Sequence, residues 1–246
     1  MSLELLWKHR RVWSKKPVLA QVYRPWFEAL LAEGPPGARA LEVGAGPGFL
    51  RELARERRPD LSLTSLDVLP TPWNDLVGDA LCLPLRSEAV DVVLGLDVLH
   101  HLARPAAFFA ETARVLRPGG RLALVEPWVS PFSYPIYRFL HQEGCTLGLD
   151  PWLPFGETPG KDAFEGDAAV ASGLVRQTPA ERWRELGLHP PRTRLLNGFA
   201  YLLSLGFKPA SLLPRSLAPA AMAVDRALGP AAPLLSLRAF VVWTKA

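Results

Sequence analysis

Three glycines at alternate positions form the most specific chemical feature of the sequence. Gly44, Gly46 and Gly48 lie in the segment LEVGAGPG, which follows a short apolar run and precedes a stretch rich in helix-forming residues. A loop without side chains lets a ligand approach the backbone closely, and the first turn of the following helix offers free N–H groups to an anionic group. The segment therefore predicts a loop that binds the anionic end of a ligand.

One carboxylate follows this loop at a spacing typical of nucleoside recognition. Asp67 comes 19 residues after Gly48, at the end of the next predicted strand, where a carboxylate accepts hydrogen bonds from ribose hydroxyls. The dinucleotide fingerprint would place its third glycine at position 49, which is Phe49 here, so NAD is disfavoured. Loop and carboxylate together predict a different cofactor that contains a nucleoside.

Several segments, in order, resemble the class I S-adenosylmethionine-dependent methyltransferases over about residues 38–127. The segments are LEVGAGPGFL (41–50), Asp67, GDALCLPL (78–85), VDVVLGLDVLHHL (90–102) and RVLRPGGRLALVEP (114–127). Ordered motifs are far more specific than a single glycine loop. The resemblance implies S-adenosyl-L-methionine as the cofactor.

The resemblance also implies which positions contact that cofactor. They are Glu42, Gly44, Ala45, Gly46, Gly48, Asp67, Val68, Asp79, Ala80, Gly95 and Leu96. In the family, the residues of the first strand and its loop border the methionine part, and those at 95–96 close over its amino-acid end. Asp67 would hold the ribose, Val68 would touch the adenine face, Asp79 would accept from the adenine amino group, and the Ala80 backbone would read the ring edge.

The chain departs from the family pattern after the second strand. Only residues 69–74 separate Val68 from the third strand, which is too few for the helix that the family usually has there. We therefore expect a loop on the adenine side of the pocket, with Trp73 either touching adenine or packed on the surface.

Methyl transfer to a hydroxyl also needs a group that removes the proton. The candidates are His100, His101, His141, Glu143 and Asp150. The pair at 100–101 fits a common family sequence in which both histidines are structural. The proposed catalytic residues are therefore His141 and Glu143, in the segment through which an acceptor would enter. No Cys and His cluster has metal-ligand spacing, so no metal site is predicted.

Alternating strands and helices must position these groups. Apolar runs at 38–43, 61–68, 90–95, 121–126 and 237–244 predict strands, and helical patterns cover 18–33, 49–58 and 105–116. This alternation predicts an α/β fold: a doubly wound, mostly parallel, Rossmann-like sheet of seven strands. Thr178 to Glu181 predicts a helix that begins with a capping box.

We expect one domain over residues 1–246, with four parts. Residues 1–37 form an N-terminal helical segment and 38–127 the cofactor-binding half. The aromatic-rich residues 128–177, after the fifth strand, form a lid or substrate insertion. Residues 178–246 complete the sheet and contain an apolar, basic insertion at 197–230, before the last strand.

Composition bounds the class of protein. With 246 residues, 49% of them hydrophobic, the chain can bury a core, and it has no secretory signal or membrane-spanning stretch, so we expect a cytoplasmic protein. Residues 1–16 carry five basic groups against one acidic, and residues 192–246 seven against one. One interpretation of the basic ends and the apolar insertion is peripheral contact with a membrane. The alternative is that the ends are ordinary solvated faces and that the insertion is a helical cap on the core.

The leading hypothesis is a methyltransferase acting on a small-molecule, sugar or glycolipid acceptor, which includes lipid-linked acceptors. Alternatives are a quinone-type C-methyltransferase, a nucleic-acid methyltransferase and a cofactor-binding protein without turnover. Nucleic acid is disfavoured because Asp97-Val98-Leu99-His100 stands where a catalytic N/D-P-P-Y/F motif usually lies. The sequence fixes neither the acceptor nor the oligomeric state.

Overall fold

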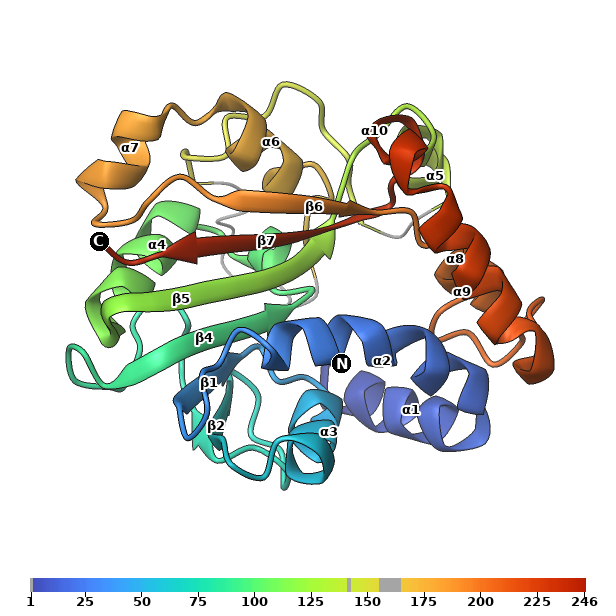
Figure 1. Ribbon diagram of the computed structural model, residues 1–246, viewed down its shortest axis with the longest axis horizontal. Helices are drawn as coiled ribbons and strands as arrows, with labels where there is room; N and C mark the ends of the chain where they lie inside the picture. Colours follow the sequence, from blue (N-terminus) through green and yellow to red (C-terminus); the bar gives the residue numbers. More distant parts are fainter. Residues whose placement is uncertain (1, 141–142, 155–164) are drawn as a thin grey trace.

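A seven-stranded sheet forms the centre of the computed structural model, which describes residues 2–140, 143–154 and 165–246 (Figure 1). The strands are β1 (Arg39–Val43), β2 (Ser62–Asp67), β3 (Leu76–Val77), β4 (Val90–Leu96), β5 (Leu116–Pro127), β6 (Arg192–Leu196) and β7 (Arg238–Thr244). Their order is β3-β2-β1-β4-β5-β7-β6. Strand β7 runs antiparallel to both of its neighbours, β5 and β6, and the other pairs of neighbouring strands are parallel. The predicted mostly parallel α/β sheet is confirmed.

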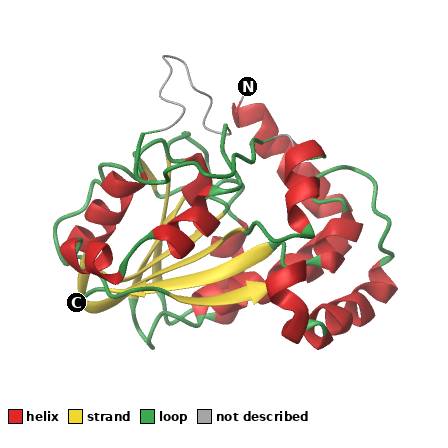
Figure 2. Ribbon diagram, turned by 90° about the horizontal axis from the view of Figure 1, so that it is seen from above, coloured by secondary structure: helices red, strands yellow, loops and turns green. Residues whose placement is uncertain are grey.

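Helices cover both faces of the sheet (Figure 2). The α-helices are α1 (Ser2–Lys15), α2 (Pro17–Leu31), α3 (Phe49–Arg57), α4 (Pro105–Val115), α5 (Ser133–Phe139), α6 (Val170–Gln177), α7 (Ala180–Glu185), α8 (Phe199–Ser204), α9 (Ala218–Ala227) and α10 (Ala232–Leu235). Short 3₁₀ turns are η1 (Leu99–His101), η2 (Arg215–Leu217) and η3 (Gly229–Ala231). Within the described residues, no helix combines the length and apolar character needed to cross a bilayer.

The alternation of side chains along β4 divides the interior into two cores. Val93 points into one core with Phe108 and Trp183, on the face covered by α4, α6 and α7. Its neighbours Val92 and Leu94 point into the other, on the face covered by α2 and α3. Successive side chains of a strand face opposite sides of the sheet, so this one buried strand is apolar throughout, as its sequence predicts.

The parallel strands bring the groups of interest to one edge. The carboxyl ends of β1, β2, β4 and β5 lie side by side because these strands run in the same direction. The glycine loop follows β1, Asp67 ends β2, η1 follows β4, and Glu126 lies next to the end of β5. Because β7 is antiparallel, its first residue, Arg238, pairs with Pro127 at this same edge.

Two local predictions are wrong. Strand β5 begins at Leu116 instead of residue 121, because the backbone of Gly119 and Gly120 exchanges hydrogen bonds with Lys245 and remains in the sheet. No side-chain capping bond begins α7, because the Thr178 hydroxyl accepts a hydrogen bond from the Trp152 indole at 2.8 Å. In both cases, a hydrogen bond to a residue distant in sequence replaced the structure that the local pattern predicts.

Candidate active site

The glycine loop adopts a backbone that requires glycine. The φ angles of Gly44, Gly46 and Gly48 are 63°, 50° and 79°, in the left-handed region that side chains disfavour. A Cβ atom at Gly44 would also lie only 2.6 Å from Cγ2 of Val98. The loop therefore requires glycine for its backbone conformation and, at Gly44, for close packing against Val98.

Asp67 is bonded directly to this loop, as its place in the sheet predicts. Its Oδ2 accepts the Gly46 N–H at 2.8 Å, and its Oδ1 accepts the Leu69 N–H at 2.9 Å. Each carboxylate oxygen retains a second lone pair for a ligand hydroxyl. Asp67 thus joins the end of β2 to the glycine loop while keeping acceptor capacity.

Glu42 is a buried acid next to the same loop. It is 5% exposed, and within the described part of the chain its Oε2 atom has no hydrogen-bond partner. Burial, reinforced by repulsion from Asp67, raises the pKa of Glu42 to about 8. A buried carboxyl oxygen without a partner suits a cationic or hydrogen-bonding group of a bound ligand, so these residues fit the ammonium and ribose of S-adenosyl-L-methionine.

The remaining positions implied for the cofactor lie around this centre. The Gly78 N–H donates to the Asp67 carbonyl at 3.0 Å, so Asp79 and the buried Ala80 follow directly beside β2. Val68 is 54% exposed, which leaves its side chain accessible to a ligand.

The loop at 69–75 contains no helix, as its length predicts. Trp73 donates its indole N–H to the Gly46 carbonyl at 2.6 Å, and its ring lies against Gly48. From α1, Trp7 packs edge-on against the same indole at 4.8 Å between ring centroids, and the Arg10 guanidinium lies 4.7 Å from it. Trp73 thus packs against the glycine loop, and its contact with adenine stays a prediction.

A second polar cluster surrounds η1, next to the glycine loop. Glu126 is fully buried and accepts the N–H groups of Val98 and Leu99 through Oε1, at 2.9 and 2.8 Å. Its Oε2 lies 2.6 Å from Nδ1 of His100. Because the Val98 side chain packs on Gly44, one residue connects the cofactor loop to this cluster.

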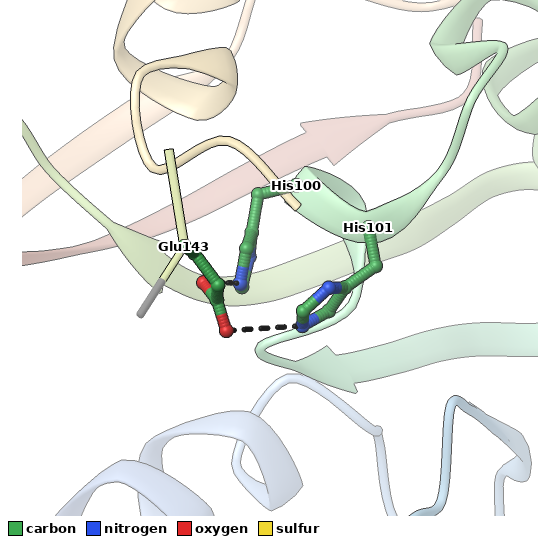
Figure 3. A group of neighbouring side chains, drawn as sticks. All are labelled: His100, His101 and Glu143. Carbon is green, nitrogen blue, oxygen red and sulfur yellow. Dashed lines mark ion pairs between the residues drawn. The ribbon is translucent and has the colours of Figure 1, made fainter. Parts of the chain in front are cut away.

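Glu143 approaches the two histidines of η1 from the insertion (Figure 3). Its Oε2 lies 3.1 Å from Nε2 of His100, and its Oε1 lies 3.8 Å from Nε2 of His101. Burial disfavours a charged His100 ring, but the charge and hydrogen bond of Glu126, followed by those of Glu143, raise the pKa of His100 to about 10. Burial and the neighbouring His100 lower the pKa of His101 to about 4.

Comparison with known proteins finds a methyltransferase domain in this chain. Residues 41–124 match the model of a methyltransferase domain. A malonyl-[acyl-carrier protein] O-methyltransferase from Methylococcus capsulatus is 36% identical over 122 residues, covering 43% of this chain and 44% of that protein. This stretch of the chain therefore carries a methyltransferase domain, and the similarity supports a class I S-adenosylmethionine-dependent methyltransferase.

Other similar proteins agree with this assignment. A probable phthiotriol/phenolphthiotriol dimycocerosates methyltransferase 2 from Mycobacterium ulcerans is 36% identical over 102 residues, covering 37% of this chain and 40% of that protein. The matches thus span less than half the length of both relatives. A solved structure of geranyl diphosphate methyltransferase in complex with SAM has a TM-score of 0.52 at 16% identity, covering 93% of this chain and 89% of that one, and it shows the shared fold alone.

The predicted catalytic residues of this methyltransferase have different outcomes. Glu143 joins the cluster at η1, whereas His141 lies outside the described residues. Asp150 accepts the Trp152 N–H at 2.9 Å in a local turn. The histidines at 100–101 are the partners of Glu143 in this cluster, and their structural role stays a prediction.

Sequence reasoning missed two charged residues of the methyltransferase. Glu126 is an acid near the end of an apolar strand, a pattern that could have indicated a buried functional carboxylate. Arg238 carried no such signal: it is 4% exposed, donates to Asp97 and lies 4.7 Å from the rings of both Trp26 and Tyr201. This pair joins β7 to the turn after β4.

Proposed function

We propose that this methyltransferase acts on a small-molecule or lipid-linked acceptor that carries a hydroxyl group. The observation that supports this most strongly is the contact through Val98 between the glycine loop and the cluster of His100, His101 and Glu143. Val98, Glu126 and His100 thus link the glycine loop to Glu143, which supports a proton-accepting carboxylate at the same edge of the sheet as the cofactor site.

The cofactor residues act by binding and orientation. Glu42 and the glycine loop hold the amino-acid end, Asp67 accepts from the ribose, and the residues at 95–96 close over the site. When bound, S-adenosyl-L-methionine supplies a methyl group that forms a bond to the acceptor oxygen as the carbon–sulfur bond breaks and its electron pair returns to sulfur. Alignment contributes most of the acceleration in such a reaction.

Glu143 receives the proton that the acceptor oxygen releases on methylation. Its side chain is 20% exposed, whereas Glu126 is fully buried and occupied by His100 and two backbone N–H groups. Glu143 is therefore the carboxylate of the cluster that an incoming acceptor can reach. His141, outside the described residues, stays a second proposed catalytic residue.

Exposed apolar side chains favour a lipid-linked acceptor within this class. Phe139 and Leu140, at the end of α5, are 74% and 76% exposed, and Leu212, after α8, is 69% exposed. Lys208 and Arg215 add positive charge close to Leu212 in the sequence. The relatives' names include an acyl-carrier-protein and a phthiotriol dimycocerosate methyltransferase, which supports an acceptor with a long apolar part.

A methyl-transfer screen tests the proposal. Purified chain and radiolabelled S-adenosyl-L-methionine are incubated separately with lipid extracts, acyl-carrier-protein thioesters, nucleotide sugars and RNA. We expect label in a lipid or acyl fraction, abolished in Glu143→Gln but retained in Glu56→Gln, an exposed control. Label confined to RNA would refute the acceptor class.

Cofactor binding is tested separately by calorimetry with S-adenosylhomocysteine. Asp67→Asn removes charge while keeping the shape of the side chain, and a charge-assisted hydrogen bond contributes about 1.5 to 3 kcal/mol. The dissociation constant should rise roughly 10- to 150-fold, with no change in the exposed control Asp60→Asn. Equal affinities in the two variants would contradict the assigned ribose contact.

A further inference from the structure

Three metal-ligating atoms from two segments of the chain lie close together in the cluster at η1. Nε2 of His100, Nε2 of His101 and a carboxylate oxygen of Glu143 all lie within 4.8 Å of one another (Figure 3). The imidazole rings lie 4.1 Å apart between centroids, and Glu143 faces both. We propose that His100, His101 and Glu143 bind one divalent first-row transition-metal cation.

The hydrogen bond of His100 directs a lone pair toward Glu143. When Nδ1–H of a neutral ring donates to Glu126, the other nitrogen, Nε2, carries the lone pair. That atom lies 3.1 Å from a carboxylate oxygen, and two electron-rich atoms at this distance repel each other. A positive centre must therefore lie between them, and it is either a proton on His100 or a bound cation.

The convergence of a third donor favours the cation. A proton on His100 would bond to Glu143 alone, whereas a metal ion would also use Nε2 of His101, which lies 3.8 Å from the same carboxylate. Asp97, the next acid at this edge, is already paired with Arg238.

The distances suit a transition metal. Metal–nitrogen and metal–oxygen bonds of about 2.0 to 2.2 Å place neighbouring ligand atoms roughly 3 to 3.5 Å apart. The separation of 3.1 Å between His100 and Glu143 already lies in this range, and that of 3.8 Å to His101 requires only a small side-chain rotation. Two imidazoles and one carboxylate form a donor set that suits Zn²⁺ or Fe²⁺ and leaves coordination positions open.

The groups behind the ligands are already fixed. Oε2 of Glu126 contacts Nδ1 of His100, and Oε1 accepts the N–H groups of Val98 and Leu99. A carboxylate behind a ligating histidine sets the ring orientation and strengthens the metal–nitrogen bond. Glu126 near the end of β5 thus holds His100 of η1 in position before a cation binds.

A cation here would change how the acceptor loses its proton. This step rests on the proposed function: an acceptor hydroxyl bound at an open position has a lower pKa, and Glu143 then acts by holding the cation. The hydroxyl proton passes to solvent, and the acceptor oxygen retains the electron pair that forms the new bond to carbon. Metal binding itself does not depend on that step.

Metal titration without cofactor tests the site. Untagged chain is dialysed against a chelator and titrated with Zn²⁺ by calorimetry and with Co²⁺ by visible absorption, which reports nitrogen and oxygen ligation directly. We expect one ion per chain. Affinity should fall at least tenfold in His101→Ala and Glu143→Gln, and 10- to 100-fold in Glu126→Gln. The exposed histidine variant His189→Ala should bind like the unaltered chain.

The results separate this site from the proposed function. Circular dichroism confirms that each variant is folded, and S-adenosylhomocysteine titration of the metal-free chain tests the cofactor site independently. One Zn²⁺ or Co²⁺ per chain, lost in the cluster variants, supports the site whatever the cofactor titration gives. No ion bound at 100 µM metal, or equal binding by His101→Ala and His189→Ala, overturns it and leaves a proton between His100 and Glu143.

Discussion

Replacing Glu42 by glutamine should remove a pH-dependent loss of stability from this protein. Because burial and Asp67 raise the pKa of Glu42 from 4.5 to about 8, the folded chain holds one more proton than the unfolded chain between these pH values. Stability is therefore fully present below pH 4.5 and falls as pH rises toward 8. The slope is about 1.4 kcal/mol per pH unit, which sums to roughly 4 to 5 kcal/mol.

Urea unfolding of the cofactor-free chain at pH 5, 6, 7 and 8 measures this effect. Glutamine resembles the protonated acid and cannot ionise, so Glu42→Gln should match the unaltered chain at pH 5 and exceed its stability increasingly at higher pH. Titrating groups that do not interact with Glu42 cancel in the difference between the two curves. Glu56→Gln, at a side chain 59% exposed, should show no such trend.

A difference in unfolding free energy that stays constant from pH 5 to pH 8 would refute the reasoning. It would mean that Glu42 ionises without cost in the folded protein. Adding S-adenosyl-L-methionine provides a second arm, because an ammonium group beside Glu42 favours the ionised form. The difference in unfolding free energy between Glu42→Gln and the unaltered chain should then depend less on pH.

Two further changes test how the site is held in place. Lys16 donates through Nζ to the carbonyls of Gly206, Lys208 and Ala210 at 2.6 to 3.0 Å. Lys16→Met should therefore lower the free energy of unfolding in urea by about 2 to 4 kcal/mol. Unchanged stability would show that water replaces these bonds. A Cβ atom at Gly95 would lie 2.7 Å from Val98 and 2.9 Å from Leu124. Gly95→Ala should therefore lower the free energy of unfolding, measured by thermal denaturation, by about 1 to 3 kcal/mol. An unchanged melting temperature would show that this edge of the sheet can expand.

Local patterns predicted the framework of the cofactor site. The glycine loop, the strands before and after it and Asp67 are all readable because their signals lie within a few residues of one another. Chain direction then placed them together, since parallel strands end at one edge of a sheet. The hydrogen bond between Asp67 and Gly46 follows from that geometry, and so does the helix-free loop that carries Trp73.

Contacts over long sequence separations decided the rest. Glu143 meets His100 across 43 positions and Arg238 meets Asp97 across 141, and no periodicity relates either pair. The Thr178 hydroxyl accepts a hydrogen bond from the Trp152 indole instead of capping the helix that follows it. Side-chain pairing of this kind depends on how insertions fold back over the sheet. The sequence by itself predicted the loop and the carboxylate that we propose bind a nucleoside cofactor, and only the tertiary structure showed which charged groups lie beside them.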